Sequence, residues 1–319
     1  MNYAIGVDIG GTKIHFALVD KAGRIIRHEI VPTLAGLGPE HVMQSVLGGI
    51  DKLIRQGEEQ IAGIGIGSAG QIDFATGTVS FAVDTLPGWT GTPIKQTVEQ
   101  RFGLTVYVDN DVNVIAIAEK CFGAGRQYEH YVCLALGTGV GGAVVADGRL
   151  IRGTSGGAGE LGHSSVQFDG PRCSCGNYGC IEMYASGTGI ARVALEALGD
   201  DDASNTRGLS AIEVLADWTV GAPYAVRAMG VVIRALASAI SGIIHTFNPQ
   251  AIIIAGGVAE AGSAFFAALE KEAAARTSPG MWKDCRIVPS YTGAGAGVIG
   301  AAAQVWHYAE ERSGKQVSL

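Results

Sequence analysis

The chain has 319 residues, enough for two domains of ordinary size, and its 47% hydrophobic content excludes an intrinsically disordered protein. The formal net charge of -7 argues against the clustered basic surface that nucleic-acid binding needs, so no nucleic-acid partner is expected. The 48 glycines follow no triplet repeat, which excludes a collagen-like fibre. We expect them in tight turns and where backbone approaches a ligand closely.

The first half of the chain predicts a mixed α/β lobe. In chain order, its apolar patterns predict strands over residues 3–8, 14–20 and 24–31, a helix over 39–56, strands over 61–66 and 104–108, and a helix over 111–122. Glycine-rich turns separate the first strands. Alternating strands and helices of this kind indicate an α/β fold.

The second half begins with the same succession of strand, glycine turn and strand, at residues 131–136, 137–142 and 143–146. The remaining elements are expected as helices over 181–198, 211–218 and 223–247, a strand over 251–255, a helix over 261–276, a strand over 286–289 and a last helix from 297. The repetition predicts two related lobes, residues 1–118 and 119–296.

The sequence favours a cytoplasmic protein with no membrane partner. Its N-terminus lacks a basic segment followed by an apolar stretch. The longest apolar region, residues 228–247, is interrupted by Arg234 and His245, which favours a buried helix over a membrane span. Three of the six cysteines crowd into one short segment, which indicates metal binding rather than a disulfide framework.

Three glycine turns are candidate nucleotide contacts. Asp8-Ile9-Gly10-Gly11-Thr12-Lys13 follows an apolar strand and supplies backbone N–H groups, a hydroxyl and a positive charge for phosphate, while Asp8 suits Mg²⁺. Gly137-Thr138-Gly139-Val140-Gly141-Gly142 repeats this chemistry, and Gly256-Gly257 follows a third strand. Each is also compatible with a plain turn, but two hairpins with the same chemistry favour a nucleotide site. The chain holds no P-loop motif.

A polar run, Asp109-Asn110-Asp111-Val112-Asn113, stands where a strand ends and a helix begins. Helix capping explains one such residue, and four in five positions indicate ligand chemistry at the carboxyl end of a strand. The spacing does not choose between Asp109 and Asp111.

His163, Cys173, Cys175 and Cys180 predict a structural zinc site. Three thiolates and one imidazole fill a closed tetrahedral Zn²⁺ site, and the glycines between the cysteines permit a tight knuckle. The alternative is a set of reduced thiols without metal. Glu182 lies just beyond the knuckle, where the metal would fix its position.

Taken together and in this order, the motifs resemble the ROK family of sugar kinases over essentially the whole chain. They are residues 8–13, the Asn110-Asp111-x-Asn113 run, residues 136–142, residues 159–163 and the Cys173-x-Cys175-Gly176-x-x-Gly179-Cys180-x-Glu182 knuckle. The family also contains repressors with an N-terminal DNA-binding extension. Here the first phosphate motif starts at residue 8, so a kinase is expected.

The resemblance implies an actin/hexokinase-like (ribonuclease H-like) fold, with a central cleft between two α/β lobes and the last helix, 297–319, crossing back to the first lobe. It implies ATP with Mg²⁺ as cofactors, a sugar substrate and a homodimer. Asp111 matches the catalytic base. The positions matching sugar contacts are Gly70, Asn110, Glu160, His163 and Glu182, and those matching nucleotide contacts are Gly10, Gly11, Thr12, Lys13, Thr138, Gly139, Gly256 and Gly257.

The resemblance implies phosphorylation of the 6-hydroxyl of an aldohexose. Glucose is the first expectation, followed by N-acetylmannosamine and N-acetylglucosamine. Discrimination at the sugar's 2-position is expected to depend on the segment Pro87-Gly88-Trp89-Thr90. The rivals from other classes are a non-catalytic sugar-sensing protein and an actin-like assembly ATPase. The two phosphate turns and Asp111 argue against the first, and the zinc knuckle argues against the second.

Overall fold

The computed structural model describes residues 2–82, 86–199 and 208–312 and divides into two compact units. The N-terminal unit comprises Met1–Gln127, Leu150–Ala158 and Tyr291–Leu319, and the C-terminal unit comprises Tyr128–Arg149 and Gly159–Ser290. The boundary predicted after residue 118 differs from this division, because it falls inside helix α3 (Asp111–Phe122), which packs along α10 (Ala296–Arg312). Residues 313–319 of the predicted last helix lie outside the described residues.

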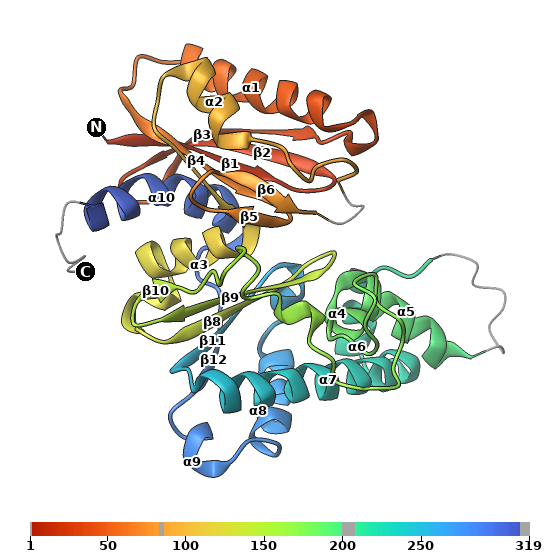
Figure 1. Cartoon of the computed structure of the whole chain (residues 1–319). Helices are drawn as coiled ribbons and strands as arrows, with labels where there is room; N and C mark the ends of the chain where they lie inside the picture. Colours follow the sequence, from red (N-terminus) through yellow and green to blue (C-terminus); the bar gives the residue numbers. More distant parts are fainter. Residues whose placement is uncertain (1, 83–85, 200–207, 313–319) are drawn as a thin grey trace. The chain divides into compact units, whose positions relative to one another are not determined.

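The N-terminal unit is built on a five-stranded sheet in the order β3-β2-β1-β4-β7 (Figure 1). Its strands are β1 (Tyr3–Ile9), β2 (Lys13–Asp20), β3 (Ile25–Pro32), β4 (Ile61–Ser68) and β7 (Val106–Asn110). The first three are antiparallel neighbours, whereas β1, β4 and β7 run parallel, with Ile9 opposite Ser68 and Ser68 opposite Asn110. The carboxyl ends of these three strands therefore meet at one edge of the sheet.

Helices cover both faces of this sheet (Figure 1). The helices α1 (Pro39–Arg55) and α2 (Ile94–Phe102) bury apolar side chains against one face, in a core that includes Ile5 and Val7. On the other face, α3 and α10 pack against small residues such as Ala4 and Ala17. A short hairpin, β5 (Gln71–Asp73) and β6 (Thr78–Phe81), follows β4.

The C-terminal unit repeats this topology. Its sheet has the order β10-β9-β8-β11-β12, with β8 and β9 antiparallel and β8, β11 and β12 parallel. Its strands are β8 (Tyr131–Leu136), β9 (Val140–Ala146), β10 (Arg149–Leu150), β11 (Ala251–Ala255) and β12 (Arg286–Pro289). The internal repeat predicted from the sequence is therefore confirmed as two sheets of matching strand order.

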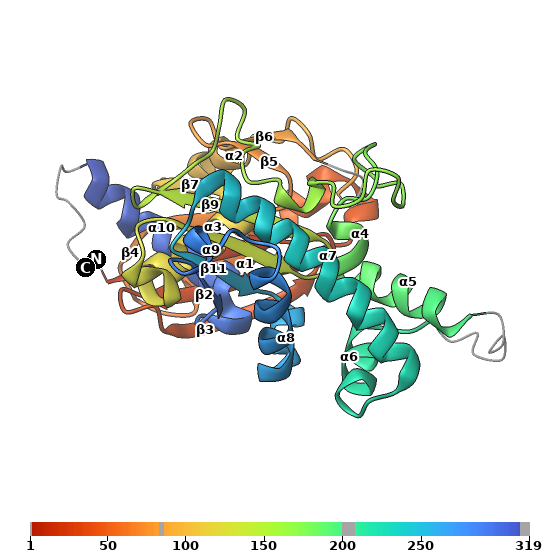
Figure 2. The same cartoon turned by 90° about the horizontal axis from the view of Figure 1, so that it is seen from below.

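Helix α7 (Pro223–Phe247) is the main core helix of the C-terminal unit. It lies beside α5 (Gly187–Leu198), α6 (Ala211–Thr219) and α8 (Ser263–Ala274) (Figures 1 and 2). It is long and apolar enough to cross a bilayer, yet side chains such as Leu236 and Ile240 are wholly buried in the unit.

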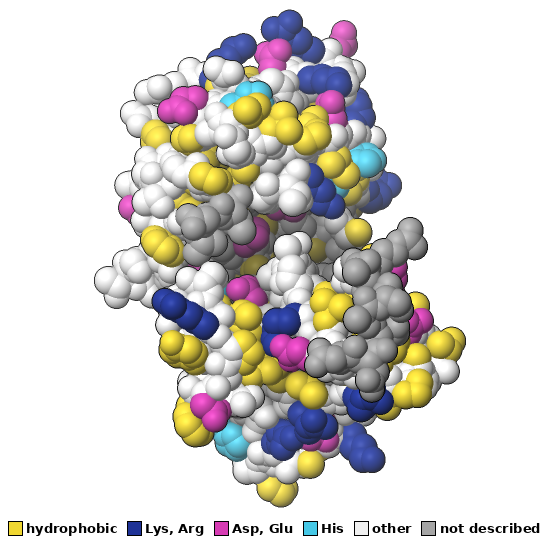
Figure 3. Space-filling model, turned by 90° about the vertical axis from the view of Figure 1, so that its right-hand side faces the viewer, with side chains coloured by type: hydrophobic (Ala, Val, Ile, Leu, Met, Phe, Trp, Pro, Cys, Tyr) yellow, Lys and Arg dark blue, Asp and Glu magenta, His cyan; other side chains and the backbone are white. Residues whose placement is uncertain are grey.

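Lys and Arg side chains lie beside Asp and Glu side chains on the face drawn in Figure 3. The remaining helices are α4 (Glu182–Ala185) and α9 (Pro279–Trp282).

Most predicted elements are confirmed, and three differ from the structure. The helix predicted over 181–198 is two helices, because the Ser186 side chain caps α5 by accepting from the Gly189 N–H. The glycine turn predicted over 137–142 ends at residue 139, since Val140 already pairs with Leu136. The helix predicted from residue 261 starts at Ser263, after a 3-10 turn over Gly257–Ala261.

Candidate active site

The carboxyl edge of the N-terminal sheet gathers the predicted site residues of that unit. Asp8 is near the end of β1, Gly70 follows β4, and Asn110 and Asp111 stand at the junction of β7 and α3. Parallel strands bring these turns to the same edge although they are far apart in the sequence. The parallel pairing of these strands thus explains why motifs that follow different strands lie close together.

The turn between β1 and β2 is held by a residue that the sequence did not single out. The buried Thr33 donates from Oγ1 to the Gly10 carbonyl at 2.6 Å and from its N–H to the Thr12 carbonyl at 3.0 Å. The Gly10 N–H donates to the Lys13 carbonyl at 3.0 Å. These bonds occupy backbone carbonyls and leave the side chains of Thr12 and Lys13 exposed, as a phosphate-binding turn requires.

Burial makes ionisation of the Asp8 carboxylate unfavourable. Burial raises its pKa to about 6, although the positive charge of Lys13 acts in the opposite direction. The first turn of α10 packs directly on it, since a Cβ at Gly297 would lie 2.3 Å from Asp8 Oδ2. Only glycine at position 297 leaves room for this carboxylate. A group of this kind gains from a bound cation, which favours its ionised form.

The junction of β7 and α3 is fixed by Asn110. Its side-chain oxygen caps α3 by accepting from the N–H groups of Val112 at 2.9 Å and Asn113 at 3.3 Å. Its Nδ2 donates to the Gly70 carbonyl at 3.0 Å, and one amide hydrogen remains for a further acceptor. Asp111 is the first residue of α3, and its Oδ1 accepts from the Val112 N–H at 2.9 Å.

The structure distinguishes the two aspartates that the spacing left open. Asp109 is 1% exposed, and Arg152 donates to its Oδ2 from Nε at 2.9 Å and from a terminal nitrogen at 2.7 Å. Its Oδ1 accepts from the Asn110 N–H and from the Asn113 side chain. Both oxygens of Asp109 are therefore committed to the protein, which leaves Asp111 as the candidate base.

In the C-terminal unit, the turn between β8 and β9 lies against Glu182. The Val140 N–H donates to Glu182 Oε2 at 3.0 Å, and a Cβ at Gly139 would lie 2.6 Å from the same oxygen. A side chain at position 139 would therefore displace the Glu182 carboxylate from this turn. The Gly187 N–H donates to the Gly137 carbonyl at 2.7 Å, and Thr188 Oγ1 donates to the Thr138 carbonyl at 3.2 Å.

The turn at Gly256-Gly257 lies at the same edge of the C-terminal sheet. Strands β8 and β11 run parallel, with Ala135 opposite Ala255, so the turns that follow them are neighbours. A Cβ at Gly256 would lie 2.4 Å from the Leu136 carbonyl oxygen. The structure brings together the two candidate nucleotide turns of this unit.

The segment with Glu160 and His163 packs on β9. The Leu161–His163 3-10 turn lies so close to this strand that a Cβ at Gly162 would overlap the Val140 carbonyl. Burial raises the pKa of Glu160, His163 lowers it, and the neighbouring Glu182 raises it. Two acidic side chains and one imidazole therefore gather in this unit, as the sequence predicted.

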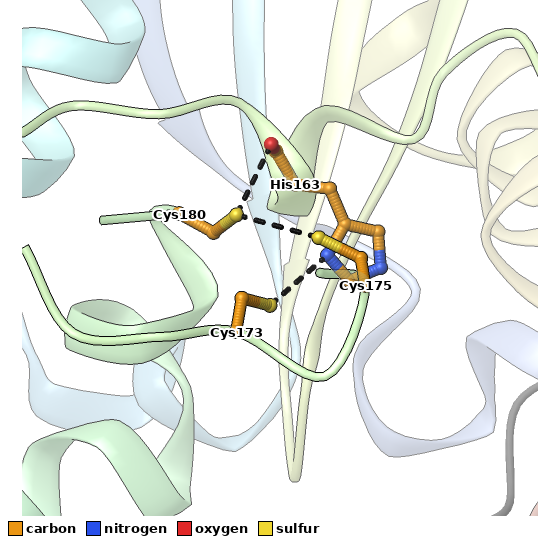
Figure 4. A group of neighbouring side chains, drawn as sticks. All are labelled: His163, Cys173, Cys175 and Cys180. Carbon is orange, nitrogen blue, oxygen red and sulfur yellow. Dashed lines mark hydrogen bonds between the residues drawn. The ribbon is translucent and has the colours of Figure 1, made fainter. Parts of the chain in front are cut away.

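His163, Cys173, Cys175 and Cys180 form one cluster whose ligand atoms lie within 4.8 Å of one another (Figure 4). Cys175 Sγ lies 3.6 Å from Cys180 Sγ, and Cys173 Sγ lies 3.6 Å from His163 Nδ1. Ligands of a tetrahedral zinc ion lie about 3.5–3.8 Å apart, given bonds of about 2.3 Å to sulfur and about 2.0 Å to nitrogen. The donor set fits zinc. His163 presents Nδ1 to the Cys173 sulfur.

Within the segment expected to affect discrimination at the sugar's 2-position, the structure buries Trp89. Its side chain is 1% exposed and packs in the core of the N-terminal unit. Its indole N–H donates to Ser68 Oγ at 3.0 Å. Its neighbours Pro87, Gly88 and Thr90 are exposed. The sequence pattern could not separate a core tryptophan from a binding tryptophan, since both sit in a glycine- and proline-rich loop.

Comparison with known proteins places these features in a family. A model of the ROK family matches residues 4–307. A glucokinase from Thermotoga maritima is 37% identical over 305 residues, spanning 93% of this chain and 95% of the relative. A ROK family glucokinase from Streptomyces griseus, solved in complex with glucose and AMPPNP, is 33% identical with a TM-score of 0.81 over 94% of this chain and 98% of that one. A ROK hexokinase from Thermus thermophilus is 30% identical with a TM-score of 0.82, over 97% and 99%.

Proposed function

The chain belongs to the ROK family, and from that membership we propose that it is an ATP-dependent glucokinase with the actin/hexokinase-like fold of its relatives. The reaction transfers the γ-phosphate of ATP to the 6-hydroxyl of glucose. Glucokinases at 34–37% identity support glucose as the substrate over the N-acetylhexosamines.

One observation carries the assignment of the base. Of the two aspartates at the end of β7, Asp109 is buried and bound through both oxygens, whereas Asp111 begins α3 at the edge where the strand ends converge. Asp111 accepts the proton of the 6-hydroxyl as that oxygen attacks the γ-phosphorus in line. Asn110 and the Gly70 backbone hold the sugar beside it, and the Asn110–Gly70 hydrogen bond fixes the two turns relative to each other.

In the C-terminal unit, Glu160 and Glu182 are assigned as acceptors for sugar hydroxyls, and His163 as a donor to a sugar oxygen through its Nε2–H. Zinc bound by His163, Cys173, Cys175 and Cys180 would keep the segment between Glu160 and Glu182 folded, and its role is structural because four protein ligands close the coordination sphere. His163 serves both purposes through its two ring nitrogens.

Each unit contributes candidate nucleotide contacts. In the N-terminal unit, Gly10, Gly11, Thr12 and Lys13 would supply N–H groups, a hydroxyl and positive charge for phosphate. In the C-terminal unit, Thr138 and Gly139 would supply similar phosphate contacts, and Gly256 and Gly257 are assigned to the adenosine. Asp8 would hold Mg²⁺, whose charge offsets that of the phosphates during transfer. A nearby cation would stabilise the ionised form of Asp8, and the raised pKa of Asp8 therefore supports a role in holding Mg²⁺.

The protein is further proposed to be cytoplasmic and homodimeric, with no nucleic-acid or membrane partner. The burial of α7 within its own unit supports a core role for the most apolar helix.

A coupled assay of ADP release tests the proposal. With ATP and Mg²⁺, turnover on glucose should exceed that on mannose, fructose, N-acetylmannosamine and N-acetylglucosamine. Asp111→Ala should fold and bind glucose but lose turnover by about 10²–10⁴-fold, the usual contribution of a general base. Preference for an N-acetylhexosamine would refute the glucose assignment. Binding of sugar and ATP without turnover on any sugar would favour the sugar-sensing alternative.

A further inference from the structure

Within residues 2–82, 86–199 and 208–312, Arg152 makes no side-chain hydrogen bond with a residue proposed to bind substrate, yet it binds Asp109, which precedes Asn110 and Asp111. It donates to Asp109 Oδ2 from Nε at 2.9 Å and from a terminal nitrogen at 2.7 Å. Its side chain is 20% exposed and that of Asp109 only 2%. A buried carboxylate needs a partner of opposite charge, and Arg152 supplies it.

Asp109 also binds groups on both sides of the turn between β7 and α3. Its Oδ1 accepts from the Asn110 N–H at 2.8 Å and from Asn113 Nδ2 at 2.7 Å. One carboxylate therefore ties the end of β7 to the first turn of α3, and Asp111 lies between these two anchors.

Arg152 is itself held by aromatic side chains. Its guanidinium lies 3.8 Å from the ring centre of Phe74 and 5.4 Å from that of Tyr308, and it donates to the Tyr308 hydroxyl. Proximity to Asp109 and Tyr308 raises the pKa of Arg152 against the effect of burial, so its charge is permanent. Planar stacking and a two-pronged contact are properties of arginine that lysine lacks.

We propose that Arg152 is a positioning residue for phosphoryl transfer, acting through Asp109 on the turn that carries Asp111; this rests on the proposed role of Asp111. It belongs to Leu150–Ala158, which is part of the N-terminal unit although the chain on either side belongs to the other unit. Displacing a reacting group by about 1 Å costs about 10²-fold in rate, so loss of Arg152 should lower kcat by about that factor.

The test compares Arg152→Ala and Arg152→Lys with Arg27→Ala. Arg27 is the matched control, because it makes a two-pronged ion pair with Glu59 in the same unit at 2.8 and 2.6 Å, away from the site. For each variant, kcat, the KM for glucose and the melting temperature are measured. The Arg152 variants should lose kcat with little change in KM, and Arg152→Lys should lose less than Arg152→Ala. Arg27→Ala should keep its kcat.

Chemical rescue separates positioning from a general loss of stability. Guanidinium at low, non-denaturing concentration should restore part of the kcat of Arg152→Ala, since Phe74 and Asp109 still frame the vacated space. Guanidinium should not restore the kcat of an Asp109→Asn/Arg152→Ala double variant. A kcat for Arg152→Ala close to that of the unchanged enzyme, or an equal loss of kcat in Arg27→Ala, would overturn the inference. If Arg152→Ala does not fold, a kcat of Arg152→Lys equal to that of the unchanged enzyme overturns it instead.

Asp111→Asn is assayed in parallel, so that the two proposals fail separately. Undiminished turnover in Asp111→Asn would refute the proposed base and remove the reason for positioning it. Collapse of turnover in Asp111→Asn with normal turnover in Arg152→Ala would refute the positioning role alone.

Discussion

Asp8→Asn should make the protein more stable at neutral pH while damaging its activity. The perturbation replaces a carboxylate that is costly to ionise with an amide of the same shape. Raising the pKa of Asp8 from 3.8 to about 6 corresponds to about 3 kcal/mol of destabilisation once both folded and unfolded states are ionised. Asp8 keeps partial contact with solvent, so this value is an upper limit.

The direction of the pH effect on the free energy of unfolding follows from which state of the protein binds the Asp8 proton more tightly. Below about pH 4 Asp8 is protonated in both states and contributes no pH dependence. As the pH rises from about 4 to about 6, the unfolded chain releases its proton first, so the free energy of unfolding falls, and above about pH 6 the loss is complete. Asp8→Asn removes this loss.

Urea unfolding of both proteins at several pH values between 4 and 8 measures the effect. The advantage of Asp8→Asn should be smallest near pH 4 and grow to at most about 3 kcal/mol near pH 7. Asp73→Asn is the control of opposite sign, because its hydrogen bond from Thr76 lowers the pKa of Asp73. A stability difference between Asp8→Asn and the unchanged protein that does not vary with pH would refute the reasoning. Turnover should fall because Asn holds Mg²⁺ less tightly than a carboxylate does.

Three further outcomes are expected. Glu182→Gln should raise the KM for ATP as well as that for glucose, because a neutral amide replaces the charged acceptor of the Val140 N–H; a change in the glucose KM alone would contradict this. Cys175→Ser, or chelation of the proposed zinc, should increase proteolysis of the knuckle and weaken glucose binding, whereas Cys121→Ser outside the cluster should do neither. Trp89→Phe should lower the free energy of unfolding by about 1 kcal/mol through its lost hydrogen bond and leave the ranking of sugars unchanged; an altered ranking would restore Trp89 to the binding site.

The sequence by itself determined most local elements and supplied the candidate site residues. Strong apolar patterns predicted every strand of the two sheets except the short β10. Glycine-rich turns after strands marked the nucleotide candidates, because turn chemistry is local. The cluster of His163 and three cysteines was predictable, since its cysteines are close neighbours in the chain. The repeated strand–turn–strand unit also predicted two related sheets, which the structure contains. The family comparison confirms the kinase class.

Only the tertiary structure shows which polar residues are buried and bonded within the protein. Asp109 and Asp111 are equivalent in a pattern, and only Arg152, 43 positions away from Asp109, separates a bound structural carboxylate from a candidate base. Trp89 likewise became a core residue through a hydrogen bond to a strand that precedes it by 21 positions. The assignment of α3 and α10 to one unit depends on packing between segments at opposite ends of the chain. Such contacts leave no local signal, because burial and ion pairing are properties of the folded chain rather than of neighbouring residues.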